Sequence, residues 1–131
     1  MTDDGVLDLA DAFLRASEAG DVERLRSMYA PDAVVWHNVD KKEQSVDEGL
    51  AMVSWTREHL LGLRHDDVRR QRTEHGFVQQ HVLRATTPSG AELSVPACIV
   101  VTIRDGKVTR LDEYIDPTPF GVLRAEDLRG A

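Results

Sequence analysis

The chain has 131 residues and is acidic, with 16 Lys and Arg against 23 Asp and Glu side chains and a formal net charge of −7 at pH 7. That balance argues against nucleic acid as a partner, because proteins that bind phosphate backbones carry basic patches. The 41% hydrophobic and 30% charged residues are typical of a globular protein, and no run approaches the roughly 20 apolar residues of a membrane-spanning helix. We therefore expect one domain, residues 1–131, with no membrane partner.

Two features bear on the cellular location. The single cysteine, Cys98, allows no disulfide within the chain. The first residues, Met-Thr-Asp-Asp-Gly, are acidic and lack the basic and apolar regions of a signal peptide. A cytoplasmic location is therefore expected.

Two helices are expected at the amino terminus. Apolar residues recur at helical spacing over residues 6–14, and Gly20 is a typical residue just past a helix end. Asp21 is a suitable N-cap for a second helix, whose apolar face spans residues 22–29 and which Pro31 ends.

A strand, a loop and a third helix are expected next. Residues 32–38 have the β-propensity of a short strand, and the polar residues 39–44 are expected to form a loop. Ser-Val-Asp-Glu at residues 45–48 matches a capping box and predicts a helix that ends near Gly62.

The second half of the chain predicts four strands. The segment 93–103 is apolar on both faces, which indicates a strand inside a sheet that is covered on both sides. Asp105-Gly106 supplies the turn of a hairpin, and residues 117–131 look like a tail that packs back on the body. The expected strands are residues 64–73, 77–83, 93–103 and 107–116.

The order of these elements predicts the fold class. Helix, helix, strand, helix and four strands indicate an α+β domain with three helices packed on one curved sheet. The sheet is expected to be mixed and mostly antiparallel. The resulting cone-shaped roll leaves a pocket between the helices and the concave face, open at one end.

Three segments resemble the SnoaL-like group of the nuclear transport factor 2 superfamily, which includes ketosteroid isomerases, polyketide cyclases and limonene epoxide hydrolases. They are Ala-Gly-Asp-Val-Glu-Arg-Leu at 19–25, Tyr-Ala-Pro-Asp-Ala-Val-Val-Trp-His at 29–37, and the hairpin return at 104–116. The resemblance implies the fold above, a hydrophobic small-molecule ligand and a homodimer through the outer sheet face. It does not imply one reaction, because this fold hosts enzymes, binding proteins and assembly modules.

The resemblance also implies candidate catalytic positions. The general base of ketosteroid isomerases lies five residues after the aspartate that opens the first strand, which from Asp32 is His37. An Arg-x-Asp and a later Asp of the epoxide hydrolases correspond here to Gln79, His81 and Glu113. The hydrolase arginine is therefore absent, and its middle aspartate is a histidine. A histidine suits proton transfer because its ordinary pKa near 6.5 lies close to neutrality.

Strand alternation supports part of this set. It places Gln79 and His81 on one face of their strand, and Leu111 and Glu113 on one face of theirs. With one strand between them, the two backbones lie about 10 Å apart. His81 and Glu113 can then meet if the intervening residue is small, such as Ala97. We expect His37 as a base or water-orienting residue and His81 with Glu113 as an acid/base pair, or else as a structural charge pair.

Three functional readings follow. The first is an enzyme that needs no cofactor and isomerises, cyclises, dehydrates or hydrolyses a hydrophobic steroid-, polyketide- or terpenoid-like compound. The second is a non-catalytic ligand-binding protein, and the third is a dimeric interaction module. No metal site is expected, because the sequence contains neither His-Glu-x-x-His nor paired cysteines.

The remaining expectations concern the pocket lining. Trp55 is placed at the pocket mouth, with core packing as the alternative, and Asn38 sits where a strand end can turn into the pocket. His59, His65 and His75 lie in polar surroundings and are expected to be solvated. The expected ligand-binding residues are Val35, Asn38, Trp55, Gln79 and Leu111.

Overall fold

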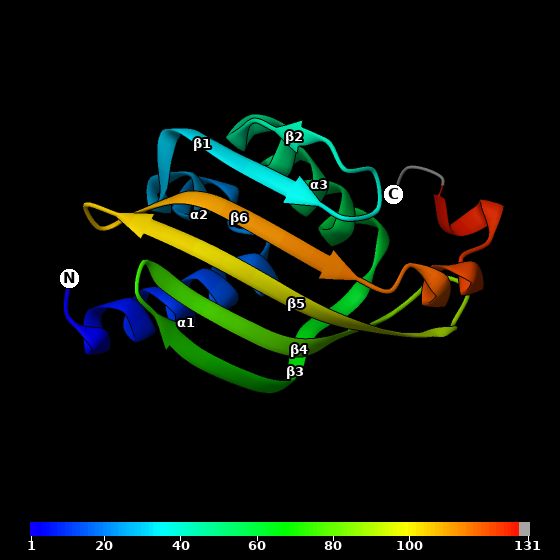
Figure 1. The fold of residues 1–131 in the computed structure, drawn as a ribbon. Helices are drawn as coiled ribbons and strands as arrows, with labels where there is room; N and C mark the ends of the chain where they lie inside the picture. Colours follow the sequence, from blue (N-terminus) through cyan, green and yellow to red (C-terminus); the bar gives the residue numbers. More distant parts are fainter. Residues whose placement is uncertain (129–131) are drawn as a thin grey trace.

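The computed structural model describes residues 1–128, which form three helices, a six-stranded sheet and two short 3-10 turns (Figure 1). The strand order is β2-β1-β6-β5-β4-β3, in which β1 pairs with β6 in parallel and every other pair is antiparallel. The elements are α1 (Asp3–Ala19), α2 (Val22–Met28), β1 (Tyr29–His37), β2 (Glu43–Gln44), α3 (Val46–His59), β3 (Leu61–Thr73), β4 (Gly76–Thr86), β5 (Glu92–Arg104), β6 (Lys107–Ile115), η1 (Thr118–Val122) and η2 (Ala125–Leu128).

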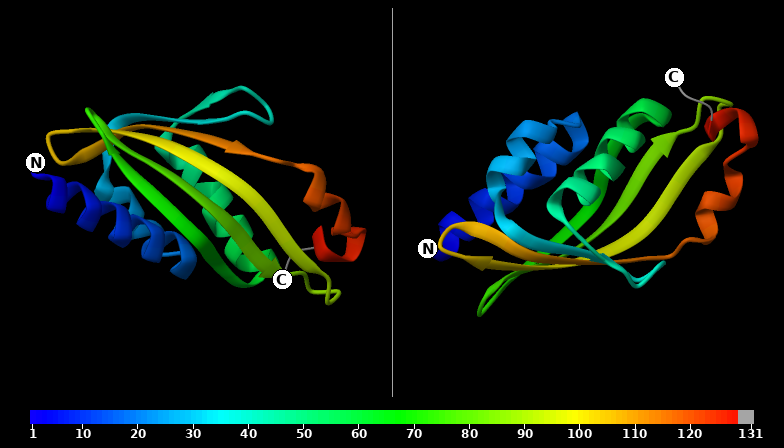
Figure 2. Two further views of the ribbon diagram at one scale, coloured as in Figure 1. Left: turned by 60° about the horizontal axis from the view of Figure 1, so that its bottom comes forward. Right: turned by 90° about the horizontal axis from the view of Figure 1, so that it is seen from above.

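The predicted α+β architecture is confirmed. All three helices lie on one face of a curved, mostly antiparallel sheet (Figure 2). The capping box at Ser45 forms as predicted, and Gly20 ends α1 in the left-handed conformation at φ 64°.

Several element boundaries differ from the prediction, since α3 ends at His59, β3 begins at Leu61 and β4 extends to Thr86, and the larger differences lie around β1. The second helix ends at Met28, and Tyr29 is already extended and opens β1. Pro31 disfavours helical geometry in Ala30, and Tyr29 pairs with Val108 of β6, so the helix does not continue past Met28. The expected loop also contains β2, whose Gln44 pairs with Val35 of β1.

The main core fills the space between the helices and the sheet. Phe13 of α1 packs its ring edge-on against Tyr29, with the centroids 5.5 Å apart. Burial of such side chains is the main stabilising contribution in a domain of this size. The core includes Val6, Ala10, Phe13, Leu25, Val35, Leu50, Phe77, Ile99, Val101, Val108 and Leu111.

The tail after β6 covers a second, smaller cluster. Phe120 and Leu123 pack against a buried cluster that includes Leu93 and Val95 of β5. Asp127, which is fully buried, accepts hydrogen bonds from the backbone N and the Oγ of Ser89 at 2.8 and 2.9 Å. The expected tail therefore does pack on the body through residue 128, and residues 129–131 of that prediction lie outside the described chain.

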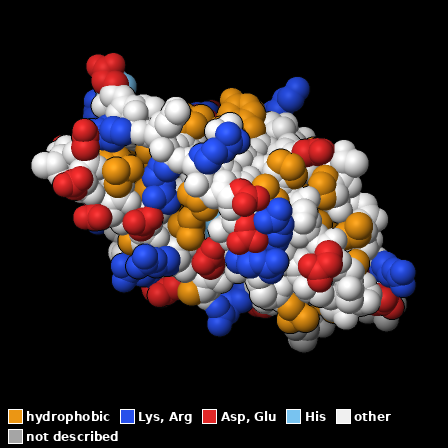
Figure 3. Space-filling model, turned by 90° about the horizontal axis from the view of Figure 1, so that it is seen from below, with side chains coloured by type: hydrophobic (Ala, Val, Ile, Leu, Met, Phe, Trp, Pro, Cys, Tyr) orange, Lys and Arg blue, Asp and Glu red, His pale blue; other side chains and the backbone are white. Residues whose placement is uncertain are grey.

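The surface around β3 carries interspersed charges of both signs (Figure 3). Asp66, for example, accepts from both Arg64 and Arg84 at 3.0 Å. Such exposed pairs contribute little to stability individually. None of the helices within residues 1–128 is long and apolar enough to cross a membrane.

Candidate functional site

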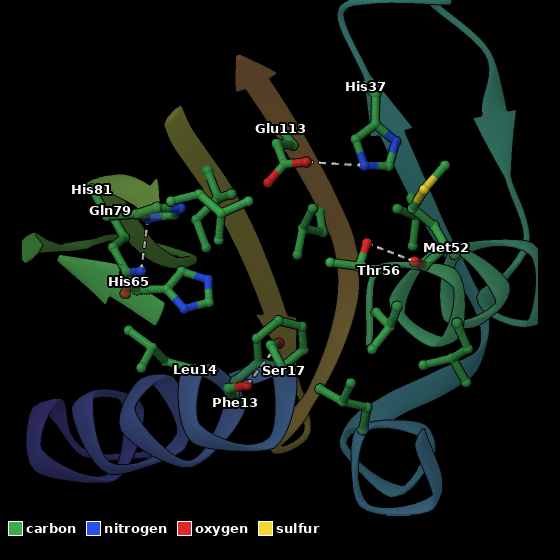
Figure 4. Close-up of a pocket in the computed structure, with 18 of the residues that line it drawn as sticks. Phe13, Leu14, Ser17, His37, Met52, Thr56, His65, Gln79, His81 and Glu113 are labelled. Atoms are coloured by element: carbon green, nitrogen blue, oxygen red, sulfur yellow. Dashed lines mark hydrogen bonds and ion pairs between the residues drawn. The ribbon is translucent and has the colours of Figure 1, made fainter. Parts of the chain in front are cut away.

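A cavity of about 160 Å³ lies between the concave face of the sheet and the helices (Figure 4). Most of its lining is apolar, so a small number of polar side chains can orient a bound ligand by hydrogen bonds. The apolar lining includes Phe13, Leu14, Leu50, Val53, Phe77, Ile99 and Leu111. The polar lining includes Ser17, His37, Thr56, His65, Gln79, His81 and Glu113.

One side of the cavity carries an imidazole and a carboxylate in contact. His37 is the last residue of β1, and the parallel register places it directly beside Glu113 of β6. The Nε2 of His37 lies 3.1 Å from the Oε1 of Glu113, and the two side chains are 19% and 27% exposed. The hydrogen bond to Glu113 raises the pKa of His37 above its ordinary value, against the opposing effect of burial.

The prediction that His81 contacts Glu113 is wrong, because each of the two residues has a different partner. The register places Ile99 of β5 directly opposite Glu113, whereas the smaller Ala97 lies opposite His81. A β-branched side chain therefore stands on the line between the two strands. Glu113 contacts His37 instead, and His81 forms its own contacts on the far side of the cavity.

That far side is built by a chain of polar contacts from α1 to β4. Asp11 accepts from Nη1 of Arg70 at 2.7 Å, and Arg70 donates from Nε and Nη2 to the Oε1 of Gln79 at 3.0 and 2.8 Å. The Nε2 of Gln79 then lies 3.0 Å from the Nδ1 of His81. Burial and then the neighbouring His65 lower the pKa of His81 to about 4, so its imidazole is neutral at pH 7.

His65, which we expected to be solvated, lines the cavity. Its side chain is 12% exposed, and its backbone N and its Nδ1 both contact the Oε1 of Glu18, at 2.7 and 3.1 Å. Its ring meets that of His81 edge-on, with the centroids 4.7 Å apart. Strand alternation could have predicted this position, because Leu63, two residues earlier in β3, also faces the cavity.

His59 is likewise buried rather than solvated. Its ring stacks on Trp55 with the centroids 4.4 Å apart, and its Nδ1 lies 2.8 Å from the backbone O of Trp55. His75, by contrast, is exposed as expected, with 76% of its side chain accessible.

The expected ligand-binding residues divide into two groups. Val35, Gln79 and Leu111 line the cavity, whereas neither Asn38 nor Trp55 is part of the lining within the described chain. Asn38 instead extends β1, because its side-chain amide pairs with the backbone of Ile115 as a backbone peptide group would. Its Nδ2 donates to the O of Ile115 at 3.1 Å, and its Oδ1 accepts from the N of Ile115 at 3.0 Å.

Tyr29 is a cavity residue that the sequence analysis missed, because it was assigned to the second helix. Burial and the nearby charge of Glu113 raise the pKa of its hydroxyl, so Tyr29 stays protonated at neutral pH. Within residues 1–128, no three His, Cys, Asp or Glu side chains are arranged to hold a metal ion.

Solved structures share the fold of this chain at low sequence identity. A proposed polyketide cyclase from Xanthomonas campestris is 14% identical with a TM-score of 0.77, over 89% of this chain and 94% of that one. AclR from Streptomyces galilaeus, a proposed hydroxylase, is 18% identical with a TM-score of 0.79, over 89% and 78%. A protein of ketosteroid isomerase-like fold from Catenulispora acidiphila, in complex with trimethylamine, is 12% identical with a TM-score of 0.71, over 81% and 83%.

The sequence comparison is more decisive about the family. No curated protein matches the chain. Residues 10–111, however, match the model of the SnoaL-like domain, and this range includes the lining residues of the cavity from Ala10 to Leu111, while Glu113 lies just beyond it. The chain belongs to the family of SnoaL-like domains.

Proposed function

We propose that this protein binds a small hydrophobic compound in the cavity and transfers a proton on it through Glu113 and His37. The reaction class is isomerisation, cyclisation or hydrolysis. The observation that carries the proposal is the contact of 3.1 Å between the Nε2 of His37 and the Oε1 of Glu113, in a cavity whose other walls are mostly apolar. A carboxylate and an imidazole in contact form a unit that can take up and return a proton.

The geometry supports a division of labour within the pair. Oε1 of Glu113 is engaged by His37, and the carboxylate points into the cavity (Figure 4), so its second oxygen is available to a bound compound. His37 stabilises the charged carboxylate and shares the proton that it takes up. The apolar walls strengthen both effects, because electrostatic interactions are larger where water is excluded.

Hydrogen–deuterium exchange tests the proposal with a simple ketone in place of the natural substrate. Cyclohexanone in D₂O exchanges its α-protons when a base removes them, and proton NMR follows the loss of signal. Wild-type protein should accelerate the exchange, and Glu113→Gln should slow the accelerated rate by about 10²–10⁴, the usual contribution of general acid–base catalysis. Glu74→Gln, which removes an 88% exposed carboxylate, is the matched control and should exchange at the wild-type rate.

Two results would argue against proton transfer. If cyclohexanone binds but wild type and Glu113→Gln exchange it equally, the protein is a ligand-binding domain. If no ring compound binds, the family resemblance favours an interaction module instead.

We also propose a homodimer through the outer face of the sheet. Trp36 and Tyr114 lie there with their ring centroids 5.3 Å apart, and Tyr114 is 48% exposed. Exposed aromatic groups of this kind are common at interfaces between proteins. Light scattering should give twice the mass of one chain for wild type and a lower mass for Tyr114→Lys, whereas a monomeric wild type at micromolar concentration would contradict the proposal.

A further inference from the structure

His81 is a buried imidazole with one unused nitrogen. The residue is only 5% exposed, and its Nδ1 is engaged by Gln79. Its Nε2 contacts no hydrogen-bonding partner within residues 1–128. Among these residues the fully buried side-chain atom without a partner is Oε1 of Gln44, so Nε2 of His81 is not fully buried. The free nitrogen therefore opens on the cavity that His81 lines (Figure 4). A ring nitrogen that faces a cavity without a protein partner is open to water or to a ligand.

The proton of His81 is placed by its neighbours. An arginine has donors and no acceptor, so the oxygen of the Gln79 amide must face Arg70, which donates to it twice. The amide nitrogen then faces His81 and donates to Nδ1. An imidazole that accepts at Nδ1 carries its proton on Nε2 when neutral. His81 is therefore a hydrogen-bond donor toward the cavity.

The charged groups around His81 favour its neutral form. Arg70 and His65 of β3 both disfavour a positive charge on the ring, and only Glu113, across β5, favours one. The two carboxylates of α1 that approach this side are already engaged, Asp11 by Arg70 and Glu18 by His65. The donor state thus persists through neutral pH.

We infer that His81 forms an oxygen-binding subsite, at which Nε2–H donates to the carbonyl oxygen of a small cyclic ketone, and that Asp11, Arg70 and Gln79 are positioning residues. The inference rests on the proposed function in taking the cavity as the ligand site. A carbonyl oxygen held at His81 acquires negative charge when a neighbouring C–H is deprotonated, and the Nε2–H stabilises that charge.

The interior of the cavity has room for one ring. Its volume of about 160 Å³ is close to that of engineered cavities that hold one benzene ring. The strands that carry His81 and Glu113 are separated by β5, so their backbones lie about 10 Å apart. A monocyclic ketone or enone, at the smaller end of the terpenoid-like compounds, is therefore the simplest probe that can reach both the donor and the carboxylate.

The first test is the protonation of His81 itself. Nitrogen-15 NMR of histidine-labelled protein distinguishes a protonated from an unprotonated ring nitrogen, and it needs no ligand. Wild type should show the proton on Nε2 at pH 7. Gln79→Glu replaces the donor to Nδ1 by an acceptor and should move a proton to Nδ1. Gln80→Glu adds the same charge to the next residue of β4, which is exposed on the opposite face, and should leave His81 as in wild type.

The second test is a matched pair of ligands, cyclohexanone and methylenecyclohexane, which differ in whether the ring carries an oxygen. Titration should show that wild type and Gln80→Glu prefer the ketone by about three- to tenfold, the value of one net hydrogen bond. At a pH where nitrogen-15 NMR shows its His81 neutral with the proton on Nδ1, Gln79→Glu should lose that preference while it still binds the alkene, which shows that the cavity is intact.

Three outcomes would overturn the inference: a proton on Nδ1 in wild type, an unchanged His81 in Gln79→Glu, or equal binding of the two ligands by wild type. Failure of the proposed function looks different. In that case the ketone preference and the Nε2 proton remain, and deuterium exchange is absent.

Discussion

Two imidazoles face the same cavity, and their partners differ in kind. His37, at the end of β1, contacts a carboxylate, whereas His81, in the middle of β4, contacts an amide that an arginine holds in place. The carboxylate raises the pKa of His37, and burial together with His65 lowers the pKa of His81 to about 4. The surroundings thus give the two histidines different properties. His37 shares a proton with a carboxylate, and His81 is a neutral hydrogen-bond donor.

The comparison indicates which side of the cavity performs which task. Pairs of titratable groups whose pKa values are driven apart by their environments are typical of acid–base sites. The side with Glu113 is suited to moving a proton, and the side with His81 is suited to holding an oxygen. Each of the following changes acts on one side and leaves the other in place.

The largest expected effect is on proton transfer. Replacement of His37 by Ala removes the partner of Glu113 and should slow deuterium exchange of cyclohexanone by about 10²–10⁴. His75→Ala, at an exposed position, is the control and should match wild type. A His37→Ala rate within about twofold of wild type, which is under 0.5 kcal/mol of barrier, would remove His37 from the mechanism.

The pH dependence of stability should report on the other side. Between pH 6.5 and about 4 the unfolded chain protonates His81 and the folded protein does not, so the unfolded state binds more protons and stability falls as the pH falls. Urea unfolding should show that wild type loses on the order of 3 kcal/mol more than His81→Leu over this interval. Parallel stability curves for the two proteins would contradict a lowered pKa.

The smallest expected effect concerns the strand end that positions His37. Asn38→Ala removes two hydrogen bonds to Ile115 and should lower the free energy of unfolding by about 1–3 kcal/mol. It should also raise the rate of backbone amide exchange more at the end of β1 than at β4. An equal change at both strands would mean that the two sides of the cavity are not independent.

Most of the fold could be predicted because its signals are local. The capping box at Ser45, Gly20 after α1 and the Asp105-Gly106 turn each depend on a few adjacent residues. Period-two alternation likewise placed Gln79 and Glu113 on the cavity side of their strands. The start of β1 at Tyr29 was missed because the same apolar residues also fit a helical face.

The contacts of the site could not be predicted, because they depend on register. A bulge in β3, where Asp67 has a φ of 56°, shifts the alternation so that both His65 and Arg70 face inward. Without that shift one of the two would face solvent, and Arg70 would not reach Gln79. Sequence alternation alone also cannot tell that Ile99 rather than Ala97 lies opposite Glu113.

The most direct test of two functionally different sides of the cavity is an NMR titration of His37 and His81 in one sample. His37 should titrate above pH 6.5 and His81 well below it, with a pKa of about 4. In Glu113→Gln the pKa of His37 should fall toward or below its ordinary value, because the hydrogen bond to the carboxylate is lost and burial remains. Two imidazoles that titrate together near pH 6.5, with no response of His37 to Glu113→Gln, would contradict the division of the cavity into a proton-transfer side and an oxygen-binding side.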